Sequence, residues 1–399
     1  MIDDANVRIL GGKKFVLAER VDVGAAVREL VGKYTFGERV AAEMVFVNGR
    51  FETELSRLGG LPKGVRVMSW EEAIAKEEEG DDNLRDYAKD IEQSFPGVNF
   101  DGKQEGALIQ VDKGVVCERP IHVMFLTVGK SRQTDAVAAS FPLVFVAADE
   151  GAECSVVETY ASDGREEKYL THAFTTIVLS ESANVDHYKL QQEGAEASHM
   201  AVQHVHMHAK SSFVNHSMSI GSEFAQNKLE VFFFEEGAEA TLNGLVIAKD
   251  EQSIENRTLL YHGVGNCSSL ELYKHVLDGK AKVGFEGKIF VKEGANGTDS
   301  KLASKSLVLT DEACMEAKPE LEIYADDVKC SHGATSGPVD ENAVFYLVSR
   351  GLSLEQARHL MTYAFAADVT RRIRVAAVRE RVEGLLAERY GLPREGIEE

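Results

Sequence analysis

The sequence predicts a mainly β protein, with a β-solenoid core over residues 96–336 between an N-terminal and a C-terminal helical region. β-branched and aromatic runs dominate this core, and helical periodicity nearly disappears from it. Its β-rich segments start 31, 29, 26 and 30 residues apart, at Gly151, Ser182, Ser211, Gly237 and Cys267. Such spacing is typical of stacked coils that bury their inward side chains against neighbouring coils, although an irregular sandwich or barrel would also give many short strands.

The N-terminal region, residues 1–95, is expected to be mixed and largely helical. Ser69, followed three positions later by Glu72, predicts a capping box at a helix start. Residues 44–51 predict a short hairpin that turns at Asn48-Gly49.

The C-terminal region, residues 337–399, is predicted to be a separate helical domain. Asp340 is expected to cap its first helix, and Ser353 with Gln356 predicts a capping box for the second. An apolar stripe follows at helical spacing, at Leu360, Met361, Ala364 and Phe365. We expect this stripe to support docking of a partner, although packing within the domain is the commoner use of such a stripe. The arginines after it are expected to form a solvated helix face, at Arg371, Arg372, Arg374, Arg379 and Arg381.

Composition excludes several functions. The chain carries 65 acidic and 44 basic residues, and its formal charge of −21 would repel nucleic acid and an anionic membrane alike. The acidic start, without a basic segment followed by an apolar run, indicates a cytoplasmic protein. No phosphate-binding loop or dinucleotide motif occurs, so we expect no ATP to be bound by this chain.

Histidines and cysteines are the candidate metal ligands. His204, His206 and His208 share one face of a strand, where an exposed polar face is favoured over a metal site because neighbouring side chains lie roughly 6.5–7 Å apart. The five cysteines are scattered and contain no C-x-x-C pair, which disfavours a disulfide framework or a structural zinc site.

The densest polar cluster, residues 320–335, contains Cys330 and His332. In an extended chain the two share a face, so that the imidazole could lower the pKa of the thiol or both could ligate one soft metal. A buried cysteine at a strand end is the alternative. Because two ligands do not close a tetrahedral or cluster site, the pair is interpreted as a half-site that another chain completes.

This cluster carries a family resemblance. Residues 318–328, Cys330-Ser331-His332-Gly333-Ala334-Thr335, Phe345-Tyr346-Leu347 and Ser349-Arg350-Gly351 together resemble the signature of the SufB/SufD family. The likeness covers roughly residues 100 to 370. The Cys-Ser-His-Gly-Ala-Thr form resembles SufD, because SufB members typically carry an acidic residue in place of the histidine. At Cys267 the family more often has Thr, so no function is assigned to that thiol.

The resemblance implies a right-handed parallel β-helix, a heterodimer with SufB and a C-terminal domain that docks the SufC ATPase. It also implies that a transient Fe–S cluster or iron is handled at the SufB–SufD interface by His332, with Cys330 beside it. We therefore expect a scaffold or accessory subunit of the SUF machinery and not an enzyme. The alternatives are a SufB-like scaffold that builds clusters by itself, and a β-helical enzyme acting on an acidic polysaccharide. A homodimer of the isolated chain also stays open.

Overall fold

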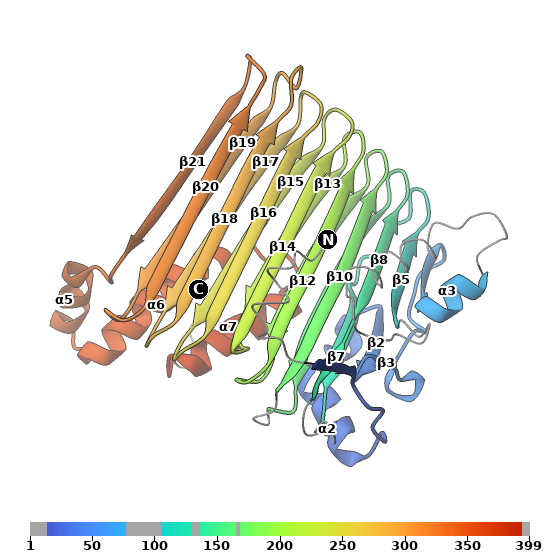
Figure 1. Ribbon diagram of the computed structural model, residues 1–399, viewed down its shortest axis with the longest axis horizontal. Helices are drawn as coiled ribbons and strands as arrows, with labels where there is room; N and C mark the ends of the chain where they lie inside the picture. Colours follow the sequence, from blue (N-terminus) through green and yellow to red (C-terminus); the bar gives the residue numbers. More distant parts are fainter. Residues whose placement is uncertain (1–13, 77–104, 130–135, 165–167, 393–399) are drawn as a thin grey trace.

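The computed structural model describes residues 14–76, 105–129, 136–164 and 168–392. Strands make up 49% and helices 19% of the described residues, and the core is a β-solenoid of about seven turns (Figure 1). The mainly β fold predicted from the coil spacing is confirmed. No helix within the described ranges is long and apolar enough to cross a membrane.

Two sheets form the walls of the solenoid. Sheet A contains, in spatial order, β20 (Cys314–Ile323), β18 (Lys282–Val291), β16 (Ser253–His262), β14 (Phe224–Phe233), β12 (Ser198–Met207), β10 (Tyr169–Leu179), β8 (Leu143–Ala148), β5 (Gly106–Val111) and β4 (Val65–Ser69). In addition, β7 (Ala136–Ser140) pairs with β10, and β1 (Lys14–Leu17) pairs with β7. Sheet B contains β21 (Lys329–Gly337), β19 (Asp299–Val308), β17 (Ser268–Leu277), β15 (Glu239–Ala248), β13 (Ser212–Ser219), β11 (Asn184–Gln192), β9 (Glu153–Ser162), β6 (Ile121–Thr127), β2 (Ala42–Val47) and β3 (Arg50–Phe51). Strands of successive coils pair in parallel and in register.

The coils turn at residues in the left-handed region of the backbone. One such residue, 27 to 31 positions after the previous one, precedes each strand of sheet B from β9 to β19: Gly151, Ser182, Lys210, Gly237, Asn266 and Gly297. Their amides donate to a carbonyl of the next coil, at 2.7 to 3.1 Å. The spacing seen in the sequence is therefore the spacing of stacked turns.

Inward side chains of successive strands form columns along the solenoid axis. Cys154, Val185, Phe213 and Ala240 occupy one column of sheet B, in four consecutive coils, and all four are buried. In-register parallel pairing causes this stacking, because equivalent side chains of adjacent strands point to the same face. The side chains that contact a given inward residue are therefore set by its position along the strand and by the coils on either side.

The N-terminal region supplies strands to both sheets as well as helices. The hairpin of β2 and β3 is confirmed, with Asn48 and Gly49 at φ 51° and 74° in its turn. β2 pairs with β6 and β4 with β5, so the region extends the solenoid itself. The Ser69 hydroxyl accepts from the Glu72 amide at the start of α3 (Trp70–Lys76), and α2 (Ala25–Tyr34) and two 3₁₀ turns (Gly37–Arg39, Thr53–Leu55) complete the region. Residues 1–13 and 77–95 of the predicted region lie outside the described part of the chain.

Three C-terminal helices pack against the outer face of sheet B: α5 (Glu341–Ser349), α6 (Leu354–Thr370) and α7 (Ala376–Arg389). Asp340 caps α5, and Ser353 with Gln356 forms the expected capping box of α6. Lys274 of β17 fixes α6, because its ammonium donates to the Phe365 carbonyl and lies 2.9 Å from the carboxylate of Asp368.

One of the predicted solvated arginines has a structural role instead. The Arg381 guanidinium donates to the carbonyls of Lys33 and Thr35, at 3.2 and 2.9 Å, and lies over the Phe36 ring. This contact ties α7 to the N-terminal region. The run of arginines in the sequence does not reveal this contact, because the carbonyls that Arg381 binds are about 350 residues earlier in the chain.

Candidate functional site

Cys330 and His332 lie on the last coil of the solenoid. β21 is the end strand of sheet B and pairs with β19 alone, with Cys330 opposite Ser300 and His332 opposite Leu302. Ser300 and Leu302 point into the core, where both are buried. Because the strands are in register, Cys330 and His332 point toward the same interior.

No further coil covers this end of the solenoid among the described residues. β20 and β21 are the terminal strands of their sheets, at the left of Figure 1, and most of their side chains are exposed or half-buried. Cys330 is half-buried and His332 is exposed. The arrangement places two potential soft-metal ligands side by side on an inward face that is open to solvent.

The surroundings of Cys330 favour a neutral thiol. Cys330 packs against the main core cluster, as do the partly buried Leu321, Ala325 and Val328 of the same coil. Burial raises the pKa of the Cys330 thiol, and the backbone amide of Ser300 opposes this shift only in part. Burial is therefore the dominant influence on this thiol, and both interpretations of the pair, a thiol activated by His332 and joint ligation of a metal, stay predictions.

The other cysteines do not reach this site. Cys314 is exposed but begins β20, and it lies about 30 Å from Cys330 because the chain runs the length of a ten-residue strand before it reverses into β21. Cys267 is buried and its thiol contacts two backbone carbonyls at 3.4 Å. Cys117 and Cys154 are buried, and burial raises the pKa of both thiols, that of Cys154 to about 12.

The histidine trio on β12 does not converge. His204 lies 3.0 Å from Glu230, and His208 lies 3.3 Å from Glu235. His206 packs edge-on against neighbouring phenylalanine rings of the same outer face. Within the described ranges, no three His, Cys, Asp or Glu side chains are placed to hold a metal ion.

The predicted docking stripe is largely a packing surface. Met361 and Phe365 pack on the hydrophobic cluster between the helices and sheet B, Leu360 is half-buried and Ala364 is exposed. The more prominent apolar surface lies on α5 and at the start of α6. Phe345, Tyr346 and Leu354 are 74%, 56% and 56% exposed there.

The sequence analysis did not predict a group of buried polar side chains inside the solenoid. Glu158 accepts from the Tyr160 hydroxyl at 2.6 Å and lies 2.9 Å from the His187 imidazole. Lys189 stacks on Glu158 in register and donates to Asn227, and burial lowers the pKa of Lys189 to about 8. Glu158 and Lys189 are one coil apart in the sequence, so the coil period could have revealed that they are neighbours.

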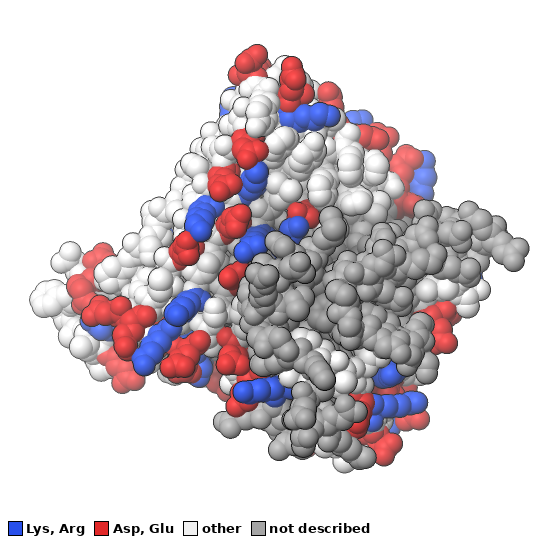
Figure 2. All heavy atoms as spheres, in the orientation of Figure 1, with Lys and Arg blue, Asp and Glu red and all other residues white. Residues whose placement is uncertain are grey.

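The outer face of sheet A carries mixed charges (Figure 2). Arg257 lies 3.4 Å from Glu255 and 3.6 Å from Glu286, and Lys288 lies 2.7 Å from Glu322. Neighbouring strands therefore alternate basic and acidic side chains. The basic groove that an enzyme acting on an acidic polysaccharide would need is not found on the described part of this face.

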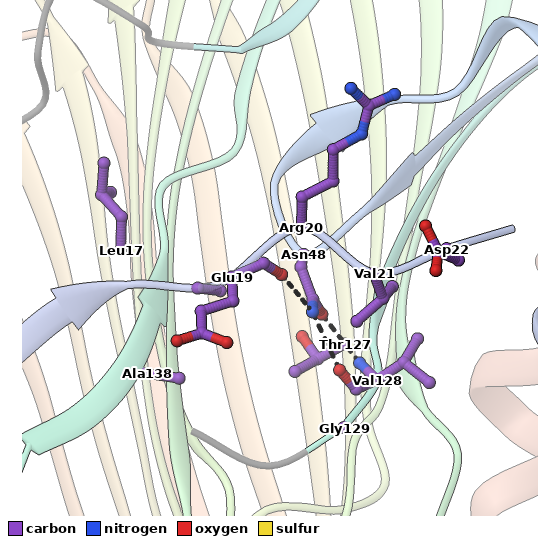
Figure 3. Close-up of a pocket in the computed structure, with 11 residues that line it drawn as sticks. Leu17, Glu19, Arg20, Val21, Asp22, Asn48, Thr127, Val128, Gly129 and Ala138 are labelled. Carbon is purple, nitrogen blue, oxygen red and sulfur yellow. Dashed lines mark hydrogen bonds between the residues drawn. The ribbon is translucent and has the colours of Figure 1, made fainter. Parts of the chain in front are cut away.

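A cavity of about 420 Å³ lies at the opposite, N-terminal end of the solenoid (Figure 3). The Asn48 side chain projects between two chain segments there, donating to the carbonyls of Glu19 and Val128 and accepting from the Val128 amide, at 2.8 to 2.9 Å. These bonds use both ends of the Asn48 amide. The cavity thus lies where the N-terminal segment joins β6, far from Cys330 and His332.

The last coil lies within a region that matches a known protein family. The family model described as SUF system FeS cluster assembly, SufBD core domain, matches residues 130–365, which include β20, β21 and α5. An iron–sulfur cluster assembly SufBD family protein of Synechocystis sp. is 28% identical over 376 residues, covering 92% of this chain and 81% of the relative. The iron–sulfur cluster assembly protein SufD of Escherichia coli is 29% identical over 349 residues, covering 88% of this chain and 79% of the relative.

Proposed function

Because the chain belongs to the SufBD family of the SUF iron–sulfur cluster assembly system, we propose that it is a SufD-type scaffold subunit and not an enzyme. Its relatives include a SufD, as the Cys-Ser-His-Gly-Ala-Thr sequence predicted. The observation that carries the proposal is the open last coil, on which Cys330 and His332 point into an interior that no further coil covers in the described part of the chain.

The proposed partner at the open end is SufB. β20 and β21 each leave one edge of backbone amides and carbonyls without a neighbouring strand in the described structure. Another protein that ends in a matching pair of strands can continue both sheets, because main-chain hydrogen bonds of parallel strands form at any exposed edge. Such pairing would also enclose the inward side chains of the last coil.

The substrate handled at this junction is a transient Fe–S cluster or iron. A cysteine thiolate and an imidazole are suitable ligands for iron in such clusters. Two ligands are too few for a closed site, so the partner is expected to supply the remaining ones. The raised pKa of the Cys330 thiol fits a site that holds metal only when the partner completes it, since metal binding must displace the thiol proton.

The exposed apolar surface on α5 and at the start of α6 supports the proposed docking of the SufC ATPase. Phe345, Tyr346 and Leu354 form an apolar group of the kind that marks protein interfaces. ATP would be bound by SufC, since this chain carries no phosphate-binding loop. We propose that the assembly works in the cytoplasm.

Cluster assembly in the co-expressed complex tests the half-site. His332→Ala is expected to abolish cluster formation on the purified complex while SufB and SufC still co-purify, because a ligand is lost from an exposed position that supports no core packing. His204→Ala is the matched control, since His204 is a strand histidine that contacts a carboxylate on the outer face. Full cluster content in the His332→Ala complex would overturn the assignment.

Pull-down of SufC tests the docking surface. Phe345→Asp combined with Tyr346→Asp is expected to reduce SufC capture at least tenfold, because the two rings are the most exposed large apolar pair on α5. Phe234→Asp is the control, as Phe234 follows β14 and is 47% exposed. Equal capture by both variants would exclude α5 as the docking surface.

The alternatives predict different behaviour of the purified chain. A SufB-like scaffold would hold a stable, stoichiometric cluster after anaerobic reconstitution without a partner, and that result would replace the accessory role proposed here. A homodimer that pairs its own open ends would be seen by light scattering and would be displaced by added SufB. The polysaccharide-acting enzyme is disfavoured by the mixed charge of sheet A.

A further inference from the structure

Beneath Cys330, a chain of hydrogen bonds runs two coils into the solenoid. Ser300 is the register partner of Cys330, and Ser269 is the register partner of Ser300 one coil deeper. The two hydroxyl oxygens are 2.5 Å apart, and Ser269 Oγ lies 3.0 Å from His262 Nε2 at the end of β16. We call His262, Ser269 and Ser300 the hydroxyl ladder; all three side chains are buried.

The surroundings of His262 decide which of its nitrogens carries the proton. Its ring stacks on Phe233, with centroids 4.3 Å apart and planes 9° apart, and its Nδ1 has no hydrogen-bond partner. Burial lowers the pKa of His262 to about 4, so the ring is neutral at neutral pH and carries one N–H. A buried N–H without an acceptor is rarer than an acceptor without a donor. The proton is therefore on Nε2, the nitrogen that faces Ser269.

This tautomer fixes the direction of the ladder. With His262 Nε2–H donating to Ser269 Oγ, the Ser269 hydroxyl is free to donate to Ser300 Oγ. The Ser300 hydroxyl hydrogen is then not used within the ladder. The next side chain in the column is Cys330, on a strand about 4.8 Å away.

We propose that Ser300 is a positioning residue for Cys330: the hydroxyl ladder turns the Ser300 O–H toward the cysteine sulfur and favours that sulfur as a metal-bound thiolate. The Ser300 backbone amide lies beside the same sulfur. Hydrogen bonds to ligating sulfurs orient them and tune the metal that they hold. The inference rests on the proposed half-site. It adds Ser300 to that site, although serine is not a typical ligand of soft metals and no sequence motif marks this position.

Cadmium binding to the full chain tests the role of the ladder. All variants carry Cys314→Ser, which removes the exposed thiol at the far end of β20. The sulfur-to-cadmium charge-transfer absorption reports metal on Cys330, and Ser300→Ala or Ser269→Ala is expected to weaken the apparent cadmium affinity about tenfold. Ser304→Ala is the matched control, because Ser304 is a buried, inward serine of the same strand whose hydroxyl has no partner. We expect it to change the affinity less than twofold.

The outcomes separate the ladder from the half-site. If Cys330→Ala leaves the absorption unchanged, Cys330 binds no metal, and the half-site and the ladder proposal are both overturned. If Cys330→Ala removes the absorption but Ser300→Ala behaves as Ser304→Ala, the half-site stands and the ladder is overturned.

A second measurement does not depend on metal. Two-bond proton–nitrogen correlation spectra of the histidine-labelled chain report the tautomer of each ring, and His262→Gln identifies the signal of His262. We expect the Nε2–H tautomer. The Nδ1–H tautomer would reverse the ladder, so that Ser300 accepts from Cys330 and favours the thiol, and it would overturn the proposal.

Discussion

Glu271 allows a quantitative test of the polar interior. It lies in the column of His332, two coils deeper, with Leu302 between them. Its side chain is fully buried, Oε1 accepts from the Thr258 hydroxyl at 2.7 Å, and Oε2 has no partner. Burial raises the pKa of Glu271 from 4.5 to about 7, because a carboxylate would be charged and half-satisfied there. Glu271→Gln removes the charge and retains the shape.

The sign of the effect follows from the raised pKa. Below about pH 4.5 the carboxyl is protonated in both states and contributes no pH dependence. As pH rises through 4.5 toward 7, the unfolded chain releases this proton first, and the native state loses stability relative to it. The pKa difference of about 2.5 corresponds to about 3 kcal/mol, lost in full above about pH 7. The neutral amide that Glu271→Gln introduces shows no such loss.

Urea unfolding at a series of pH values from 4 to 8.5 measures this difference. The quantity of interest is the free energy of unfolding of Glu271→Gln minus that of the unsubstituted chain. We expect this difference to be about 3 kcal/mol larger at pH 8 than at pH 4.5. Glu286→Gln, at an outward position of β18, controls for the loss of one negative charge. A difference between the Glu271→Gln and unsubstituted chains that does not change with pH would refute the assignment of a neutral, buried carboxyl.

Two further predictions concern packing. A Cβ atom added at Gly244 would overlap the Tyr273 ring, so Gly244→Ala is expected to lower the free energy of unfolding by about 1–3 kcal/mol. At Gly284 the nearest atom to an added Cβ is 3.5 Å away, so Gly284→Ala should lower it by less than about 1 kcal/mol. Equal melting temperatures of the two variants would contradict this prediction. Lys274→Met removes two hydrogen-bonding contacts to α6 and is expected to accelerate amide hydrogen exchange in that helix. Lys301→Met, at an exposed position, is the control and should leave this exchange unchanged. Unchanged exchange in Lys274→Met would show that apolar packing alone holds α6.

The coil repeat could be predicted from the sequence because it has a local cause. A residue such as Gly151 or Gly237 adopts a left-handed conformation with little strain, and each coil needs one at the same place. The start of the C-terminal domain was equally predictable, since Asp340 and Ser353 cap the helices that follow them. Both signals lie within a few residues of the feature that they predict.

Other features depend on contacts that local patterns do not encode. The N-terminal strands join the solenoid through pairing with β5 and β6, which the local helix signals around Ser69 do not reveal. The hydroxyl ladder joins Ser300 to His262 through register across several strands. The side-by-side placement of Cys330 and His332 followed from strand periodicity, but their open surroundings follow from the end of the solenoid.

The open last coil has a consequence for cooperativity. In a solenoid each coil is stabilised mainly by its two neighbours, so folding resembles a one-dimensional chain of coupled units. The coil of β20 and β21 has one such neighbour in the described structure, β18 and β19, and is therefore the unit from which unfolding starts at this end. A protein that stacks on it supplies the missing coupling energy. In the proposed assembly, the free energy of partner binding would therefore also stabilise the folded last coil, and the proposed half-site at Cys330 would be most ordered in the complete complex.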